Sequence, residues 1–330
     1  MKPNAPPAEY AFAYKNKPTS GNKINGLGVA EKFRPVPPFH NSGRGAGREE
    51  IPWAALDTFF IMSGPWTVFW ENVRGLWERR NAAGPVTRDP IEITDPQAMA
   101  DQVKAKAREI GIQIIGITLY DDDSQYRENA FPYKYAIMVG TVMRRDAMVT
   151  APHTPAAKEV MRGYRVGSEH ANQLAAYIRT LGWQAEGYGI GEDLVQHPMA
   201  IQSGIGTLGK HGSLINREHG SNFRISSVLT DLPLMLDQPL DFGAEDFCVS
   251  CKKCVTECPP GAIFDTKQMV RGDKKWYVDF DKCIYYFSDH MGCSICIEVC
   301  PWSEPGHGPR LSEKMLKRRA ANASAGAAMR

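Results

Sequence analysis

Helical periodicity is clearest in two segments of the chain. Asp95 is a typical helix N-cap and Pro96 a typical first helical residue, which predicts a helix that ends near Ile110. Apolar side chains over residues 154–181 recur at helical spacing, and Gly182 supplies the stop signal. The sequence therefore predicts two amphipathic helices, the second of them long.

Strand-like apolar runs alternate with these helices. The runs predicted as strands are residues 112–119, 135–143, 183–188, 213–216 and 223–229. Helices and strands that alternate in this way are typical of an α+β or α/β domain, which we expect over residues 91–243. A chain of 330 residues has room for such a core and a smaller appended module.

Residues 1–90 differ from the core in composition. They are rich in Pro, Gly and Asn, as in segments 35–38 and 41–48, and such residues interrupt regular structure. The aromatic side chains between Trp53 and Trp70 need a surface to cover them. We therefore predict an irregular N-terminal arm over residues 1–90 that packs on the core.

Charge and hydropathy exclude several classes of protein. The formal net charge is only +2, which gives no electrostatic argument for binding nucleic acid or a membrane surface. No apolar run reaches the roughly 18 residues of a membrane-spanning helix, and the first residues carry no signal-peptide core. These features predict a cytoplasmic protein. The basic segment 306–330 is predicted to be a frayed helix that ends in a disordered tail.

The eight cysteines all lie between Cys248 and Cys300, in two runs that each end in Cys-Pro. The first run has the spacing Cys-x2-Cys-x2-Cys-x3-Cys-Pro, which is the bacterial ferredoxin signature, and the second run repeats it with a longer first gap. In this signature three close thiolates bind one cubane and the fourth binds the other cluster. The spacing predicts a ferredoxin-type double [4Fe-4S] module over residues 244–305.

The fourth cysteine of each run is expected to exchange partners. The predicted ligands of the first cluster are Cys248, Cys251, Cys254 and Cys300, and those of the second are Cys258, Cys283, Cys293 and Cys296. Paired Cys-x2-Cys units also bind zinc, but zinc motifs do not normally carry two complete sets that end in Cys-x3-Cys-Pro. A disulfide framework would need an oxidising compartment, which nothing at the N-terminus implies.

A glycine-rich segment upstream of the cysteines is a candidate ligand site. Its glycines and polar neighbours are Gly204, Gly206, Gly209, Lys210, Gly212 and Ser213. Glycines at this density let the backbone approach a bulky or anionic ligand, and Lys210 could pair with the ligand's charge. The order matches neither a phosphate loop nor a dinucleotide fingerprint. A glycine-rich turn with a solvated lysine is the competing interpretation.

Three stretches follow one another along the chain: the glycine-rich segment, residues 223–234 (Phe-Arg-Ile-Ser-Ser-Val-Leu-Thr-Asp-Leu-Pro-Leu), and the two cysteine runs up to Trp302-Ser303. With these stretches in this order, residues 110–303 resemble the cobalamin-dependent reductive dehalogenases. Residues 150–182 are similar to the same family. Epoxyqueuosine reductases, which also use cobalamin and two clusters, are more distantly similar.

The resemblance implies a nitroreductase-like core that holds cobalamin without a side chain as lower ligand, next to one cluster. It implies that the glycine-rich segment through Ser213 forms part of the corrin pocket, which His197 precedes. It gives Lys210 a catalytic role, either to raise the acidity of a proton donor or to stabilise an anionic substrate or departing halide. A cation that only pairs with the corrin periphery is the alternative. We expect hydrogen-bonding roles for His197 and His211.

One position departs from the dehalogenase pattern. After the strand predicted at 135–143 the dehalogenases commonly continue Met-Asp-Tyr, the tyrosine being their proton donor, whereas this chain reads Met-Arg-Arg-Asp. Arg145 is predicted to clamp a carboxylate or phenolate of the substrate, because a guanidinium does not give up its proton. A solvated loop pair is the alternative for Arg144 and Arg145. The other groups nearby in sequence are Asp146, Tyr133, Tyr135 and Tyr188.

These observations predict a cobalamin- and iron–sulfur-dependent reductase that dehalogenates a halogenated organic compound, with aromatic compounds among the candidates. Because no flavin or reductase domain follows residue 303, we expect an external electron donor such as a ferredoxin, a flavodoxin or a reductase. One alternative is an electron-transfer protein with a vestigial cofactor pocket, which cobalamin binding would exclude. Another is an epoxyqueuosine-type tRNA-modifying reductase, which the near-neutral charge disfavours.

Overall fold

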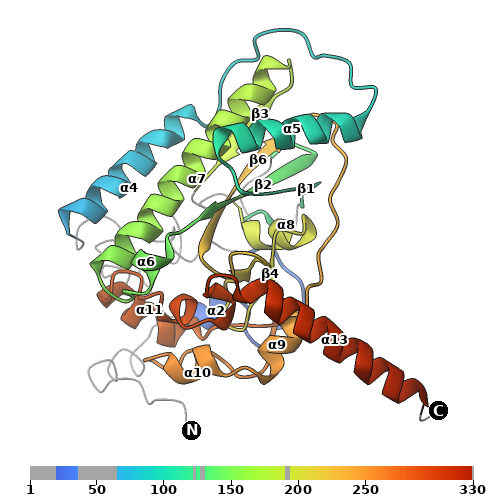
Figure 1. Cartoon of the computed structure of the whole chain (residues 1–330). Helices are drawn as coiled ribbons and strands as arrows, with labels where there is room; N and C mark the ends of the chain where they lie inside the picture. The colour runs from blue at the N-terminus through green and yellow to red at the C-terminus, as the bar shows by residue number, and fades with distance from the viewer. Residues whose placement is uncertain (1–19, 36–64, 122–123, 127–130, 190–193, 329–330) are drawn as a thin grey trace.

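A four-stranded antiparallel sheet forms the centre of the chain (Figure 1). The computed structural model describes residues 20–35, 65–121, 124–126, 131–189 and 194–328. The strands are β1 (Ile114–Leu119), β2 (Tyr135–Val142), β3 (Ala185–Tyr188) and β6 (Phe223–Thr230), in the order β1-β2-β6-β3. Because every neighbouring pair is antiparallel, the core is α+β and not a parallel α/β sheet.

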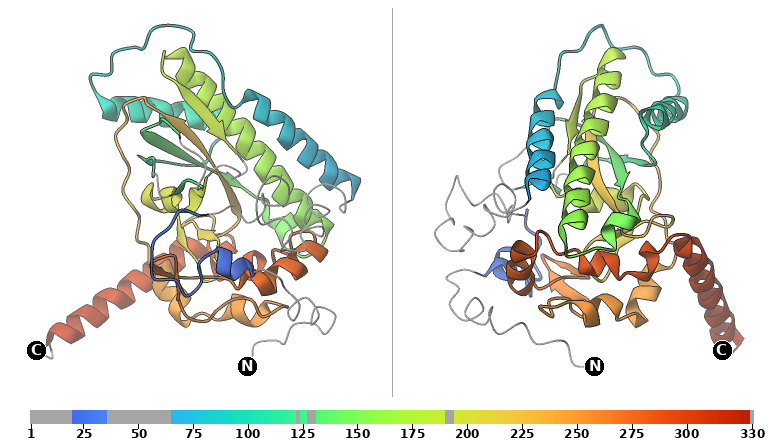
Figure 2. Two further views of the ribbon diagram at one scale, coloured as in Figure 1. Left: turned by 180° about the vertical axis from the view of Figure 1, so that it is seen from behind. Right: turned by 60° about the vertical axis from the view of Figure 1, so that its left-hand side comes forward.

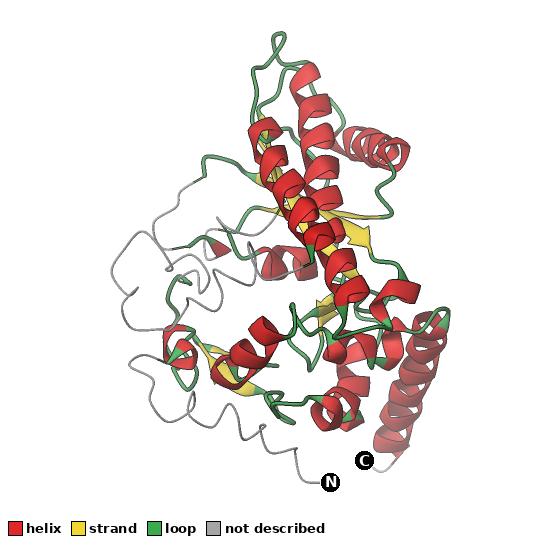
Figure 3. Ribbon diagram, turned by 90° about the vertical axis from the view of Figure 1, so that its left-hand side faces the viewer, coloured by secondary structure: helices red, strands yellow, loops and turns green. Residues whose placement is uncertain are grey.

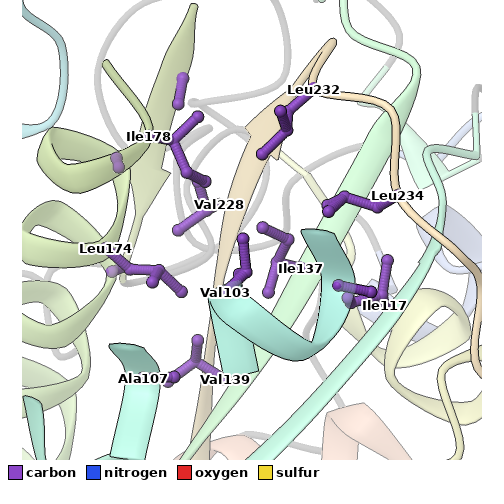
Figure 4. Packing of buried hydrophobic residues seen from close by; sticks show 14 of the residues in the cluster. Val103, Ala107, Ile117, Ile137, Val139, Leu174, Ile178, Val228, Leu232 and Leu234 are labelled. Carbon is purple, nitrogen blue, oxygen red and sulfur yellow. The ribbon is translucent and has the colours of Figure 1, made fainter. Parts of the chain in front are cut away.

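Alternate side chains of the strands face a layer of two helices, α5 (Pro96–Ile110) and α7 (Thr154–Thr180). Ile117 pairs with Ile137, and Ile137 pairs with Val228, so the three form one row across the sheet. Figure 4 shows this row packed against the helical side chains Val103, Ala107, Leu174 and Ile178. Full burial of one such aliphatic side chain contributes about 1.5–3 kcal/mol relative to exposure.

Both predicted helices are present near the predicted boundaries. The Asp95 carboxylate caps α5 by accepting hydrogen bonds from the backbone N–H groups of Gln97 and Ala98. After α7, Gly182 takes a φ of 85°, and a Cβ there would lie 2.3 Å from the carbonyl oxygen of Asp89. Glycine is therefore required at this position both for the backbone conformation and for the close approach of the chain.

The opposite face of the sheet is covered by α8 (Gln196–Gln202) and by a short hairpin of β4 (Thr207–Leu208) and β5 (Leu214–Ile215). Met199 and Ala200 of α8 and Leu214 of the hairpin pack against Met138 and Leu229 of the sheet. The glycine-rich segment therefore lies between this face of the sheet and the cysteine-containing part of the chain.

The helix α4 (Trp66–Glu78) lies along α7 (Figure 2), and a 3-10 turn, η2 (Arg79–Asn81), follows it. Val68 packs against Ala157 and Met161 of α7. This part of the N-terminal arm therefore packs on the core but is a regular helix, because its apolar residues recur at helical spacing. Residues 1–19 and 36–64 of the predicted arm lie outside the described residues.

Residues 20–35, with the short helix α2 (Gly21–Ile24), make contacts with the cysteine module. Leu27 pairs with Val270 in an isolated bridge, and Gly28 N donates to the carbonyl of Met269 at 2.8 Å. We call residues 20–35 the N-terminal strap. These backbone partners of the strap come from the module.

The cysteine module consists of short elements, whereas longer helices flank the sheet (Figure 3). Its elements are α9 (Ala244–Ser250), α10 (Lys253–Glu257), β7 (Gln268–Val270), β8 (Asp273–Lys275), α11 (Phe280–Asp289), α12 (Ile295–Glu298) and η4 (Pro301–Ser303). A further short helix, α6 (Arg145–Met148), follows β2 and reaches the module.

The C-terminal segment forms the helix α13 (His307–Ala328), which extends away from the body of the molecule (Figure 1). The helix predicted in this segment is thus present and continues to residue 328, because Ala, Lys, Arg, Leu and Met have high helix propensities. The helix is anchored by buried Met315 and by ion pairs of Arg319 with Asp241 and Asp246. In the described part of the chain, no helix has the length and apolar character needed to span a bilayer.

Candidate functional site

The cysteines form two groups, and each group draws its members from both sequence runs. The first group, whose thiols interact electrostatically with one another, consists of Cys248, Cys251, Cys254 and Cys300. The second group, related in the same way, consists of Cys258, Cys283, Cys293 and Cys296. All eight are free thiols. The structure thus brings together the side chains that the crossed assignment places on each cluster.

The local backbone explains how such short segments surround one point. Cys248 lies in α9, Cys251 follows that helix, and Cys254 lies in α10, so two helix ends present the first three thiols. In the second group the loop before α12 has four consecutive residues with positive φ, residues 291–294, and three of them are not glycine: Met291 (48°), Cys293 (45°) and Ser294 (65°). Such a run turns the chain sharply, and non-glycine residues hold it only where the surroundings impose it.

The chemistry of the thiols fits iron–sulfur clusters. Burial raises the pKa of Cys248 to about 11 and those of Cys254 and Cys300 to about 12. Metal ligation requires thiolates, so these groups need a bound positive centre to be deprotonated at neutral pH. A backbone N–H group also points at one of the sulfurs: that of Ala262 lies 3.3 Å from the Cys258 Sγ.

The glycine-rich segment is a tight turn packed against the rest of the chain. A Cβ at Gly204 would lie 2.4 Å from the carbonyl oxygen of Gln238, and one at Gly206 would lie 2.9 Å from that of Ile215. At Gly209 a Cβ would lie 2.7 Å from the ring of His211. Contacts within the protein therefore account for the small residues, which is what the competing interpretation of a glycine-rich turn expects.

Lys210 is buried, with 1% of its surface exposed, and is not the solvated lysine of that interpretation. Its Nζ lies 2.7 Å from the Asp265 Oδ1 and 5.1 Å from the centre of the Trp276 ring. Together with His211, it lines a cavity whose other walls are the first cysteine group, Phe247, Pro301 and Trp302. The lysine predicted to act on a substrate thus lies beside the first cysteine group, with its charge already paired.

Arg145 is held by the cysteine module. Its Nη1 donates to the backbone carbonyl of Glu298 at 2.9 Å, and its Nη2 pairs with the carboxylates of Glu298 and Glu304. Glu298 lies between two cysteines of different groups, Cys296 and Cys300. The guanidinium is therefore not a solvated loop cation, and its contacts dock α6 on the module.

Neighbouring Arg144 belongs to a different network. Its backbone N–H and its guanidinium donate to Glu159 at 2.8 Å and 2.9 Å, and Arg162 donates to the same carboxylate. Glu159 is fully buried. Although burial alone would raise its pKa, the hydrogen bonds from Arg162 and Arg144 lower it below the ordinary range. The ionised carboxylate thus ties the end of β2 to α7.

Both candidate histidines are largely removed from water. Burial lowers the pKa of His211 to about 4, and burial followed by the charge of Arg224 lowers that of His197 to about 4. His211 Nδ1 accepts a hydrogen bond from the backbone N–H of Ser213 at 3.2 Å, and its Nε2 lies 3.0 Å from the Ser221 Oγ. The hydrogen-bonding role predicted for His211 is therefore present.

The candidates for the missing proton donor do not converge. Tyr133 and Tyr188 pack in the apolar cluster under α8, whereas Tyr135 packs in the cluster under α5 and α7. Burial and the nearby Glu186 raise the pKa of Tyr133, which makes it a weaker acid. Asp146 is exposed, and its carboxylate accepts from the next backbone N–H.

Several residues of the site were not found by sequence reasoning. Asp265 pairs with Lys210 across 55 positions, and Glu304 pairs with Arg145 across 159 positions. No motif contains these pairs, because each forms only when the module folds onto the core. The sequence hints at these contacts only in that the acidic residues stand close to the cysteine runs.

Comparison with known proteins supports the double-cluster module. Residues 247–303 match the family model of a 4Fe-4S dicluster domain. The tetrachloroethene reductive dehalogenase of Sulfurospirillum multivorans is 27% identical over 266 residues, covering 66% of this chain and 52% of that protein. That of Desulfitobacterium hafniense is 31% identical over 207 residues, covering 59% of this chain and 37% of that protein. The chain thus spans about half, or less, of the length of these relatives.

The resemblance predicted from the sequence is confirmed. The epoxyqueuosine reductase of Escherichia coli is 28% identical, covering 67% of this chain and 73% of that protein. A solved structure of the catabolic reductive dehalogenase NpRdhA, in complex with 3-bromo-4-hydroxybenzoic acid, superposes with a TM-score of 0.71 and 26% identity. That match covers 78% of this chain and 40% of the dehalogenase. The fold of the core with its module is therefore that of reductive dehalogenases.

Proposed function

We propose that this chain is a cobalamin- and iron–sulfur-dependent reductase that replaces halogen by hydrogen in a halogenated organic compound. In such a reaction two electrons and one proton enter, the carbon–halogen bond breaks, a carbon–hydrogen bond forms and halide leaves. Cobalamin, when bound, supplies a strongly reducing metal centre for the bond cleavage. The proposal includes a nitroreductase-like architecture for the core and a cytoplasmic location.

One observation carries the proposal: the glycine-rich turn and the first cysteine group line the same cavity. Lys210 and His211 come from the turn, and Cys248, Cys251, Cys254 and Cys300 come from the module. The glycine-rich segment, one of those that carry the resemblance to dehalogenases, therefore lies beside the residues that would hold the first cluster. A freestanding ferredoxin-type module would need no such contact.

We assign the first cluster to Cys248, Cys251, Cys254 and Cys300, and the second to Cys258, Cys283, Cys293 and Cys296. Cys296 of the second group also interacts electrostatically with Cys254 of the first. The two clusters would thus be close enough for direct electron passage. In this arrangement an external donor reduces the second cluster, and the first passes electrons to the core.

The relatives suggest two substrate classes. One is named for tetrachloroethene, a halogenated alkene, and a structural neighbour was solved with a halogenated hydroxybenzoic acid. The proposed corrin-pocket residues of this chain are His197, Gly204, Gly206, Gly209, Gly212 and Ser213. Lys210 and Arg145 keep their proposed roles beside the substrate only if their ion pairs with Asp265, Glu298 and Glu304 open when cofactor or substrate binds.

Two alternatives keep the clusters and change the chemistry. An epoxyqueuosine-type reductase is favoured by the 73% coverage of the Escherichia coli enzyme, which is higher than the coverage of the dehalogenases. An electron-transfer protein is favoured by the protein contacts that fill the glycine-rich turn. The proposed dehalogenase and an epoxyqueuosine-type reductase would both bind cobalamin, whereas an electron-transfer protein would not. Cobalamin binding therefore excludes the electron-transfer alternative.

The test is anaerobic purification with added cobalamin, followed by iron, sulfide and cobalt analysis and electron paramagnetic resonance. We expect about eight irons and eight sulfides per chain for two cubanes, and one cobalt. Reduced protein is then given tetrachloroethene, 3-bromo-4-hydroxybenzoic acid or an epoxyqueuosine-containing stem loop, and halide and queuosine are measured. Halide release supports the proposal, whereas queuosine formation, or absence of cobalt at full iron content, contradicts it.

A further inference from the structure

A buried lysine lines the cavity that the first cysteine group surrounds. Lys210 shares the walls of this cavity with Cys248, Cys251, Cys254 and Cys300. Only 1% of the lysine side chain is exposed. Burial raises the pKa values of the Cys248 and Cys254 thiols, and the charge of Lys210 opposes that rise. The core thus brings a positive charge to a site whose proposed ligands all belong to the module.

The counterion of this lysine lies on the outer side and is shared. Lys210 Nζ lies 2.7 Å from the Asp265 Oδ1, and Lys252 Nζ lies 2.5 Å from the Asp265 Oδ2. One carboxylate therefore serves two lysines, and the three side chains together carry one net positive charge. Asp265 is 38% exposed and Lys252 is 62% exposed. Water and salt thus screen the carboxylate and the outer lysine more strongly than they screen Lys210.

Apolar side chains surround the inner end of this network. The Trp276 ring, whose centre lies 5.1 Å from the Lys210 Nζ, belongs to a residue that is 5% exposed. Trp276 packs in one buried cluster with Cys248, Cys300 and Trp302. In such surroundings the effective dielectric constant is lower than in water, so a charge acts with less screening. The ammonium of Lys210 therefore influences the sulfurs of the first group more than an exposed lysine would.

The second cysteine group has a lysine of a different kind beside it. Lys282 precedes Cys283 in the sequence, and its charge acts on the thiol of Cys258. Its side chain is 43% exposed, and its Nζ lies 3.6 Å from the Asp279 Oδ2. Because a cation that is exposed to this extent is screened by water, it changes the energy of a nearby cluster less than a buried one does. The two groups are thus exposed to unequal positive charge.

We propose that the buried charge of Lys210 raises the reduction potential of the cluster bound by the first cysteine group. Reduction adds negative charge to a cluster, so a nearby positive charge stabilises the reduced form more than the oxidised form. A higher potential at the first cluster makes electron passage from the second cluster more favourable, which is the direction given in the proposed function. The inference rests on the proposed ligand set and is independent of the proposed cobalamin chemistry.

The experiment is an anaerobic redox titration of the full chain, reconstituted with iron and sulfide without cobalamin and followed by electron paramagnetic resonance. Cys248→Ser identifies the titration wave of the first cluster, because it changes a ligand of that cluster. Lys210→Met removes the charge but keeps the apolar stem, and we expect it to move this wave to lower potential while the second wave stays in place. Asp265→Asn removes the countercharge and should move the first wave to higher potential. Shifts of opposite sign are what a charge effect requires, whereas a general loosening of the site does not follow the sign of the charge.

Lys252→Met is the matched control, because Lys252 pairs with the same carboxylate but is exposed. It should move the first wave clearly less than Lys210→Met does. An unmoved first wave in Lys210→Met, or equal shifts in the two lysine variants, would overturn the inference. Loss of iron from the first cluster in Lys210→Met would also overturn it, because the lysine would then hold the site together. The two lysine variants decide the question alone if Asp265→Asn loses iron. Low iron and sulfide contents in the unmodified protein contradict the proposed clusters instead.

Discussion

Lys210 Nζ lies 2.7 Å from the Asp265 Oδ1, and this ion pair joins the glycine-rich turn to the cysteine module. The lysine side chain is 1% exposed, whereas the aspartate is 38% exposed and also pairs with Lys252. The two partners are therefore not equivalent. Loss of the aspartate leaves a buried charge without a counterion, whereas loss of the lysine leaves a carboxylate that water and Lys252 still stabilise.

Asp265→Asn is accordingly expected to be the more damaging of the two changes. Removing one partner of a buried pair typically costs about 3–5 kcal/mol, and we expect the lower end because Trp276 and the amide still face the ammonium. Denaturant unfolding of the reconstituted protein measures this. Lys210→Met, which keeps the apolar stem, should cost clearly less, and an equal loss in the two variants would contradict the asymmetry.

Lys210→Met also tests the catalytic role of Lys210. If the lysine serves binding, Lys210→Met lowers the cobalt content, while turnover per bound cobalt stays within a few fold of the unmodified protein. The paired geometry leads us to expect this outcome. A fall of about two orders of magnitude in turnover at full cobalt content is the size typical of a lost preorganised charge, and it would restore Lys210 as a catalytic residue.

Local signals made much of the core predictable. The helix after Asp95 could be read because its cap, its first proline and its terminal glycine act within a few residues. The strands could be read because their buried side chains alternate or form continuous runs. The spacing also predicts that Cys258 and Cys300 exchange clusters, because three close thiolates of each run bind one cubane and the fourth cysteine binds the other. That assignment stays a prediction.

Long-range polar contacts could not be predicted from the sequence. Arg145 looked available to a substrate because its partners, Glu298 and Glu304, are 153 and 159 positions away. The contacts between the strap and the module could not be predicted, because the composition of the strap specifies irregular structure but no partner. In both cases the decisive contact depends on how the module sits on the sheet, and charge spacing along the chain contains no information about that.

Arg145→Ala should weaken the docking of α6 on the module. The guanidinium is 17% exposed and makes hydrogen bonds to one carbonyl and two carboxylates. Hydrogen bonds to charged groups contribute about 1.5–3 kcal/mol, so we expect a loss of about 2 kcal/mol in unfolding free energy. Glu304→Gln and the double variant complete a cycle, in which non-additive losses confirm the contact. A raised KM with unchanged stability would instead support the predicted substrate clamp.

Glu159 should make the stability of the core depend on acidic pH. Burial alone would raise its pKa in the folded protein, but the hydrogen bonds from Arg162 and Arg144 lower this pKa below the ordinary value of 4.5. The stabilisation is therefore present above the unfolded pKa and is lost as pH falls through the folded pKa. Unfolding free energies measured from pH 6 down to pH 3 should fall less steeply in Glu159→Gln, although that variant is less stable at neutral pH. An unchanged slope would contradict the assignment.

The N-terminal strap should stabilise the helix that carries Cys283. Asn22 donates to the Asp279 Oδ1 at 2.7 Å and accepts from the backbone N–H of Phe280 at 2.8 Å, at the start of α11. Asn22→Ala removes both contacts and should speed loss of iron from the second cluster under air, with the first cluster less affected. Asn81→Ala, which removes an exposed hydrogen bond far from the module, is the control. Equal iron loss in both variants would argue against this role.

Cys258→Ala tests whether the two runs of cysteines exchange their fourth members. Cys258 lies within the first run, yet its thiol interacts electrostatically with Cys283, Cys293 and Cys296 of the second group. If the crossing is real, the variant loses the spectroscopic signal of the cluster that Cys283→Ala also destroys, and it keeps the cluster that Cys248→Ala destroys. Each variant is reconstituted with iron and sulfide and examined by electron paramagnetic resonance at low temperature. An uncrossed arrangement would give the opposite pairing, in which Cys258→Ala and Cys248→Ala lose the same signal. This comparison decides between the crossed and the uncrossed arrangement. It needs no substrate, because each arrangement predicts which of the single-site variants have the same spectrum.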